Sequence, residues 1–264
     1  MWRKFSLFCS RGIILLQVSP PGRKDSNVDD DPVKAFVELE HYNGVTLIQK
    51  VHKSLVLLSK VIRGSILVDE TVTKLADKLM SQETPSSWQA LWEGPEDPME
   101  YIKVIVSKAA RLQERWIGKN LDQDLNLSDL FHPETFLGAL RQSTARQHHT
   151  SMESLRLANW WGARGASSKS SVRVTGIWVE GALMDGMGNL SEALSNSPSI
   201  NPAPPCTLAW VPIDKKDSRG AANMSIPLYL NAHREKVLAF LEIAVSSVNE
   251  NKWLQAGVVS FLDG

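Results

Sequence analysis

The first half of the chain has hydrophobic residues every three to four positions, which is the period of an α-helix. Aspartate before the first turn, proline in the first turn and glycine after the last turn mark the ends of helices. Together these patterns predict five helical segments, at 32–62, 70–80, 85–92, 98–117 and 133–148. The first of them would be about 45 Å long at 1.5 Å per residue.

After residue 150 the pattern changes to β-branched and aromatic stretches, which are typical of strands. Strands are expected at 155–160, 172–180, 206–211 and 225–230. Two longer apolar runs, 237–248 and 252–262, flank Asn249-Glu-Asn251 and predict a hairpin with a short turn. Both faces of these runs are apolar, which is expected where a sheet is covered or closed. A run of helices followed by a run of strands indicates the α+β class.

The first 31 residues differ from the rest of the sequence. An apolar stretch behind Arg3 and Lys4 is faintly similar to a signal peptide, but Arg11-Gly12 interrupts it. The sequence Ser19-Pro-Pro21 is also a poor cleavage site. The stretch is shorter than the ~20 residues that span a bilayer. We interpret it as an irregular or artificial start before a polar linker at 19–31, with a signal peptide as the alternative.

Composition and charge narrow the classes of function. Hydrophobic residues make up 43% of the chain, so it can bury a core and is expected to be globular. The 29 Lys and Arg balance the 29 Asp and Glu, so no overall field attracts nucleic acid or an anionic membrane. The two cysteines, Cys9 and Cys206, indicate no disulfide framework and favour a reducing compartment.

Motifs for catalysis or cofactor binding do not occur in the sequence. There is no Gly-x-x-x-x-Gly-Lys-Ser/Thr loop to hold phosphates, and no strand leads into a Gly-x-Gly-x-x-Gly turn. Glycines 181, 186 and 188 are interpreted as turn residues. His148-His149 and Cys206 lack partners at metal-ligand spacing. We therefore expect no catalytic, cofactor-binding or metal-binding residue in this chain.

A few carboxylates and one histidine are further site candidates. Glu180, Asp185 and Glu192 lie near one another in the sequence and could serve as an acid–base pair, but exposed or ion-paired carboxylates are the simpler interpretation. His132 precedes Pro133 and is interpreted as a polar residue at the start of a helix. None of these four residues has further candidate side chains near it in the sequence with which it could form a site.

The best candidate binding surface is the basic flank of the predicted helix 98–117. It carries Lys103, Lys108, Arg111 and Arg115, followed by Lys119. Five positive residues face only two negative ones on this helix, Glu100 and Glu114. The default interpretation of such a flank is a solvated face or internal ion pairs. The nine tryptophans mostly fall within apolar patterns and are expected in cores.

Seven segments go beyond general pattern and resemble, in the same order, the C-terminal region of dynein heavy chains. The most extensive is Leu130-Phe-His-Pro-Glu-Thr-Phe-Leu-Gly-Ala-Leu-Arg-Gln-Ser-Thr-Ala-Arg146, similar to that family's proline-containing turn and Phe-Leu…Gln…Ala-Arg helix. We call all seven the family landmarks: 40–43, 58–64, 85–88, 130–146, 175–182, 227–234 and 253–258.

The departures from the family pattern point to one branch. Leu127-Ser-Asp-Leu-Phe-His-Pro133 replaces a segment richer in phenylalanine, and Trp92-Glu-Gly-Pro-Glu-Asp-Pro98 replaces the usual Ser-Leu-Lys-Pro-Leu turn. The Lys-Thr that follows the family's tyrosine is missing. These variants are most similar to the heavy chain of the intraflagellar-transport dynein, the second cytoplasmic dynein. Residues 1–31 match none of the landmarks.

The resemblance implies a particular architecture and role. It implies a helical segment at 32–150 and a small antiparallel β-barrel at 151–264, lying across a ring of six AAA+ modules. ATP and magnesium would bind upstream modules, so this chain would need no cofactor of its own. The parent would be an ATP-hydrolysing, minus-end-directed microtubule motor in retrograde ciliary transport. Its partners would be that ring, other subunits of the dynein complex and, only indirectly, microtubules, in the cytoplasm, the cytoskeleton and the cilium.

A second interpretation remains open. The protein could be a free-standing protein-interaction module that uses the basic flank of helix 98–117 as its contact surface. An enzyme is the third interpretation, and no constellation of residues supports it.

Overall fold

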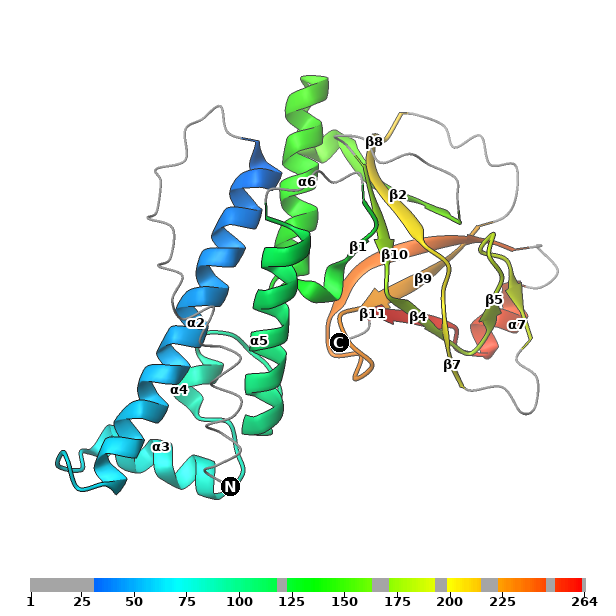
Figure 1. Cartoon of the computed structure of the whole chain (residues 1–264). Helices are drawn as coiled ribbons and strands as arrows, with labels where there is room; N and C mark the ends of the chain where they lie inside the picture. Colours follow the sequence, from blue (N-terminus) through cyan, green and yellow to red (C-terminus); the bar gives the residue numbers. More distant parts are fainter. Residues whose placement is uncertain are drawn as a thin grey trace. The chain divides into compact units, whose positions relative to one another are not determined.

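The computed structural model describes residues 31–117, 123–162, 171–192, 199–214, 223–245 and 250–262 (Figure 1). They form two compact units. The helical unit comprises residues 37–117, and the sheet unit comprises residues 31–36 together with the described residues from 123 onward. No helix among the described residues is both long and apolar enough to cross a membrane.

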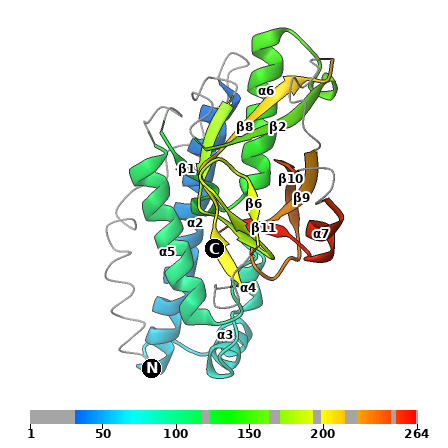
Figure 2. The ribbon, with the colours of Figure 1, turned by 90° about the vertical axis from the view of Figure 1, so that its right-hand side faces the viewer.

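The helical unit is built from four helices that follow the predicted pattern closely. Figures 1 and 2 show α2 and α5 running side by side, with α3 and α4 near the later part of α2. The α2 helix has its first turn in the sheet unit and the rest in the helical unit. The bounds are Pro32–Ile62 for α2, Glu70–Met80 for α3, Ser86–Gln89 for α4 and Pro98–Arg115 for α5.

The ends of these helices use the signals expected from the sequence. Asp69 accepts a hydrogen bond from the Val72 N–H at 2.7 Å, and Asp97 accepts one from the Glu100 N–H at 2.7 Å. Each bond satisfies a backbone donor that a helix start leaves unpaired. Gly64 has a φ of 70° just after α2, a left-handed conformation that favours glycine. Local chemistry therefore sets where these helices begin and end.

The sheet unit contains one long helix and three sheets. The α6 helix (Pro133–His148) packs on the first sheet, where the Trp210 Nε1–H donates to the Leu137 carbonyl at 3.0 Å. That sheet has the order β1-β3-β8-β2. Its bounds are Leu125–Asn126 for β1, Ser171–Thr175 for β3, Cys206–Pro212 for β8 and Leu155–Trp161 for β2.

The second sheet has five strands in the order β10-β9-β11-β4-β7. The strands have these bounds: Val237–Ala244 for β10, Asn223–Tyr229 for β9, Val259–Leu262 for β11, Ile177–Glu180 for β4 and Ile200–Pro202 for β7. A hairpin of β5 and β6 forms the third sheet. The remaining elements are β5 (Leu183–Met184), β6 (Leu190–Ser191), η1 (Leu127–Asp129), η2 (Met152–Ser154) and α7 (Glu250–Gln255).

The prediction of one strand over 172–180 is wrong, because this segment forms two strands in different sheets. The β3 strand belongs to the first sheet and β4 to the second. Between them Gly176 has a φ of 73°, and a Cβ at this position would lie 2.5 Å from the Asn126 side chain. A residue with a side chain would be strained there, so the chain turns from one sheet to the next at glycine.

The predicted hairpin of the two C-terminal runs is also wrong. The β10 strand pairs with β9, whereas β11 pairs with β4 and, in parallel, with β9. The α7 helix occupies part of the second run, at Glu250–Gln255. Phe240 on β10 is 63% exposed, so that strand is not covered on both faces. Apolar periodicity could not choose among these pairings, because each gives the strand a buried neighbour.

The α+β class is confirmed, but the closed barrel is not: the described strands form open sheets. Where β2 meets β10, side chains replace a backbone ladder. Asn159 donates its Nδ2–H to the Glu242 carbonyl at 2.9 Å and accepts from the Glu242 N–H at 2.7 Å. Trp161 donates to the same carbonyl at 2.9 Å. This junction satisfies the edge of β10 at Glu242 without closing the sheets into a barrel.

Candidate interaction surfaces

The predicted basic surface lies on α5, whose opposite face fills the core of the helical unit. Asp97 caps the helix, Pro98 begins it, and the buried residues follow a helical period. Of the four predicted contact residues, Lys103, Arg111 and Arg115 are exposed and Lys108 is half-buried. The sequence therefore placed these side chains on the correct face. Lys119 lies outside the described residues.

Lys108 is partly occupied by a contact within the unit. Its Nζ lies 5.8 Å from the ring centroid of Trp92, within the range of a cation–π interaction. The Trp92 ring is held in turn by Tyr101, with ring centroids 5.7 Å apart. A Cβ on Gly94 would lie 2.3 Å from the Trp92 ring, so the indole lies directly against this glycine. Part of the basic flank thus packs on an aromatic platform.

The platform is anchored by a buried tyrosine. The Tyr101 hydroxyl shares its proton between the Trp88 carbonyl at 2.9 Å and the Trp92 carbonyl at 3.0 Å. Burial raises the pKa of Tyr101 well above its usual value, so the hydroxyl stays a donor in mildly alkaline as well as neutral solution. The Trp88 Nε1–H donates to Ser54 Oγ at 3.0 Å, which links α4 to α2. The landmark at 85–88 therefore has a structural role.

All four cations of the α5 flank have interaction partners in the structure. Glu100 lies in the first turn of α5 and Arg115 in its last turn, positions at which these charges interact favourably with the helix dipole. These contacts give the flank a structural role whether or not a partner binds it. Its use as a contact surface stays a prediction.

A second basic surface, on α2, was not predicted from the sequence. Six exposed residues share one side of this helix within the helical unit, and we call them the α2 stripe. They are Leu39, Asn43, Lys50, Lys53, Leu57 and Lys60. The signal that could have found it is the lack of any Asp or Glu between Glu40 and Asp69. In the part of the protein that the structure describes, none of the three lysines makes an ion pair.

Three of the family landmarks meet in the second sheet. Glu180, at the end of β4, forms an ion pair with Arg234, which follows β9. A Cβ on Gly181 would lie 2.8 Å from the Ala256 carbonyl, so the glycine allows the turn after α7 to approach. The strand after that turn, β11, then lies between β4 and β9. Segments far apart in the sequence thus form one structural core.

The remaining sequence candidates have structural partners and do not converge. Asp185 accepts hydrogen bonds from Met187 N–H at 2.8 Å and Asn189 N–H at 2.9 Å in the turn between β5 and β6. A further bond from the Asn189 side chain is the main cause that lowers the pKa of Asp185. Glu192 pairs with Lys252. Glu180 and Glu192 are ion-paired and Asp185 is exposed, which agrees with the simpler interpretation of exposed or ion-paired carboxylates.

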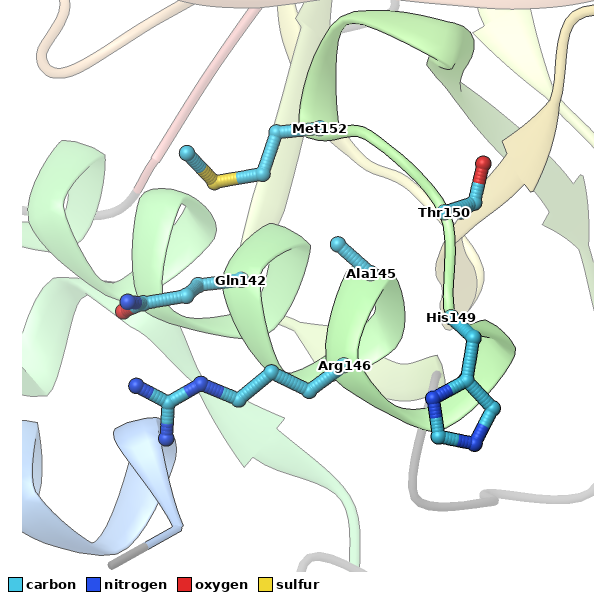
Figure 3. A pocket seen from close by; sticks show the side chains of 6 residues that line it. All are labelled: Gln142, Ala145, Arg146, His149, Thr150 and Met152. Atoms are coloured by element: carbon cyan, nitrogen blue, oxygen red, sulfur yellow. The ribbon is translucent and has the colours of Figure 1, made fainter. Parts of the chain in front are cut away.

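An open hollow of about 540 Å³ lies at the end of α6. Figure 3 shows Gln142 and Arg146 extending in the same direction from the helix, with Met152 on the segment after it. His149 also lines it and ends α6 in a left-handed conformation, with a φ of 51°. The hollow holds no nucleophile paired with a base, so its residues define no reaction.

Within the part of the chain that the structure describes, the potential metal ligands do not gather at one place. Among the described residues, no cluster of three or more His, Cys, Asp or Glu side chains suited to a metal ion occurs. Cys206 is a buried free thiol, and Cys9 lies outside the described residues. His132 occupies the position just before α6, as expected. The candidate sites are therefore two basic helix surfaces and a structural core made from landmarks.

The order of helices and strands and the positions of the landmarks point to one class of protein. The chain belongs to the family defined by the C-terminal domain of dynein heavy chains, whose family model matches residues 14–262. This confirms the resemblance drawn from the landmarks. The match begins before residue 32, so it extends into the segment that the landmarks left unmatched.

Individual relatives narrow the class to one kind of heavy chain. The protein is 41% identical over 268 positions to cytoplasmic dynein 2 heavy chain 1 of Tripneustes gratilla and 37% identical to that of Homo sapiens. Each comparison covers 99% of this chain and 6% of the relative. The protein of the same name from Chlamydomonas reinhardtii is 33% identical over 88% of this chain. The chain thus spans a small part of the length of these relatives.

Proposed function

We propose that this protein is a non-catalytic C-terminal region of a dynein heavy chain of the second cytoplasmic type. The observation that carries the proposal is the similarity to proteins named cytoplasmic dynein 2 heavy chain 1 over 99% of this chain. The confirmed family and the convergence of three landmarks in the second sheet support it. The parent motor would carry out minus-end-directed retrograde intraflagellar transport.

In this proposal the region packs on the AAA+ ring of the same heavy chain, and ATP with magnesium binds modules that precede it. The two units then serve as one structural lid. The dynein complex would place the region in the cytoplasm, on the cytoskeleton and in the cilium, with microtubules contacted only indirectly.

A chimeric motor tests the proposal. The corresponding region of the Chlamydomonas relative is replaced by residues 14–262 of this protein, and the chimera is expressed in cells that lack the native heavy chain. We expect the chimera to move in the retrograde direction at a speed near that of the native motor. A heavy chain truncated before this region is the negative control. A chimera no better than the truncated motor would contradict the proposal.

The non-catalytic role has its own measurement. The purified protein should show no saturable ATP hydrolysis, because its sequence contains no phosphate-binding loop. Saturable hydrolysis that survives further purification would contradict this part of the proposal.

A further inference from the structure

We propose that the α2 stripe is a docking surface for an acidic, partly apolar face of the preceding part of the same heavy chain. The inference rests on the proposed function and goes beyond it, because it names the surface and the chemistry of its partner. The α2 stripe consists of the six residues defined above, all of which lie in the helical unit.

The geometry of α2 gathers these residues on one narrow face. At 100° per residue, Lys50, Lys53, Leu57 and Lys60 fall within about 80° of the helix circumference. The three lysines span about 15 Å along the axis at 1.5 Å per residue. Leu39 and Asn43 continue the same line toward the start of the helix. A single extended ridge therefore presents three ammonium groups to one partner surface.

Exposed apolar side chains accompany the charge. Leu39 is 51% exposed and Leu57 is 38% exposed, and Val56 beside them is also 38% exposed. Within the described residues the three lysines have no carboxylate partner, and no acidic residue occurs from 41 to 68 to supply one along the sequence. Like charges so close together repel one another, and an acidic surface would relieve that repulsion. The apolar side chains would add buried area to the contact.

The α5 flank lacks these features. Each of its cations already has a partner, and Lys108 packs on Trp92. Two acidic residues, Glu100 and Glu114, lie on the same helix. Of the two basic surfaces, the α2 stripe is therefore the one whose lysines have no carboxylate partner among the described residues.

The positive charge of the α2 stripe also favours one binding partner over the alternatives. Residues 1–30 carry five Lys and Arg against three Asp, so they are not complementary to a basic stripe. A second copy of the α2 stripe would bring like charges together. The relatives continue far beyond the aligned region, since it covers 6% of their length. A covalently linked surface has a high effective concentration, so a modest and salt-sensitive contact is sufficient to hold it.

Zero-length carbodiimide cross-linking of the full-length heavy chain tests the inference, because it joins lysine amines only to carboxylates in direct contact. Mass spectrometry should find Lys50, Lys53 or Lys60 joined to Asp or Glu residues that precede this region. Lys74 is the internal control, since its Nζ lies 2.7 Å from Glu70 and should be joined to that residue. Raising the salt well above physiological ionic strength should reduce the α2 cross-links, because ions screen exposed charges.

A pair of matched variants provides the second measurement. One heavy chain has Lys50→Glu, Lys53→Glu and Lys60→Glu; the other has Lys103→Glu, Arg111→Glu and Arg115→Glu, an equal change of charge on α5. A protease site inserted within residues 19–31 separates the region from the ring. The α2 variant should weaken retention of the cleaved region on the order of tenfold. The α5 variant should retain it like the native protein.

The outcomes separate this inference from the proposed function. Cross-links between the region and the preceding part that avoid the three lysines would overturn the inference and leave the proposed function standing. Cross-links of these lysines only to residues 1–30, or to a separate polypeptide, would also overturn it. Equal loss of retention in both variants would do the same. A region with no cross-link to the preceding part would count against both.

Discussion

The helical unit and the sheet unit are each stabilised by a buried polar side chain, but these act over different sequence distances. In the helical unit, Tyr101 bonds the carbonyls of Trp88 and Trp92, 13 and 9 residues away. In the sheet unit, Asn159 bonds the backbone of Glu242, 83 residues away. The predicted boundaries of the helices at 32–62, 70–80 and 133–148 are confirmed, and the helices predicted at 85–92 and 98–117 are shorter in the structure. Two of the predicted strand arrangements are wrong. Elements fixed by near neighbours can be predicted from sequence, and elements fixed by distant ones cannot.

The largest effect is expected from alanine at Gly176 in the sheet unit, and alanine at Gly64 in the helical unit is the comparison. Gly176→Ala should lower the free energy of unfolding of the sheet unit by roughly 3 kcal/mol, because a left-handed φ is combined with a clash against Asn126. Gly64→Ala should cost about 1 kcal/mol, since φ is also left-handed but no atom lies within 4 Å of the added Cβ. Native-state hydrogen exchange measures each unit separately. Equal losses of free energy of unfolding in the two variants would contradict the expected difference between the two glycines.

A somewhat smaller effect is expected at the junction of β2 and β10. Asn159→Leu should destabilise the sheet unit by roughly 2 kcal/mol, because the part-buried Glu242 N–H loses its acceptor. Tyr101→Phe should cost the helical unit about 1 kcal/mol, since the Trp88 carbonyl keeps a bond from Leu91 N–H at 2.9 Å. Hydrogen exchange at residues 237–245 and at 86–101 reports the two losses. A larger effect at Tyr101 would reverse the comparison.

Helix capping should have a moderate effect confined to the helical unit. Asp69→Ala removes the acceptor for the Val72 N–H and should cost about 1 kcal/mol. Asp77→Ala, at an exposed position within the same helix, is the matched control and should have little effect. Both variants are compared by hydrogen exchange of α3. If the two aspartates prove equivalent, the cap does not set the start of this helix.

The smallest effect is expected from pH at the turn between β5 and β6. Hydrogen bonds, first from the Asn189 side chain, hold the pKa of Asp185 below its ordinary value of 3.8. A lowered pKa in the folded state stabilises the fold above that ordinary value, and this contribution is lost as the pH falls through the lower pKa. Carboxyl NMR should therefore show a midpoint below 3.8. Asp185→Asn should remove this part of the pH dependence, and a midpoint at or above the ordinary value would contradict the turn geometry.

Some of the wrong predictions had signals in the sequence. An isolated glycine in a β-branched run, such as Gly176, indicates a bend as readily as a continuous strand. The acid-free stretch from 41 to 68 marked the α2 stripe. The pairing of β11 between β4 and β9 had no such signal, because any apolar run fits a buried position in several sheets. The surface on α5 was predicted on the correct face, yet its internal contacts with Trp92 could not be seen.

The positions of the predicted helices, the α+β class and, through the landmarks, the family all followed from the order of residues alone. These properties depend on caps, periods and motifs that act over a few positions. The three-dimensional arrangement was needed to show which strands pair and how Asn159 connects two open sheets. It was also needed to show which basic helix face lacks carboxylate partners among the described residues. Those properties depend on backbone and side-chain groups that meet across tens of residues, where many arrangements satisfy the same apolar pattern and only specific hydrogen bonds and close approaches select one.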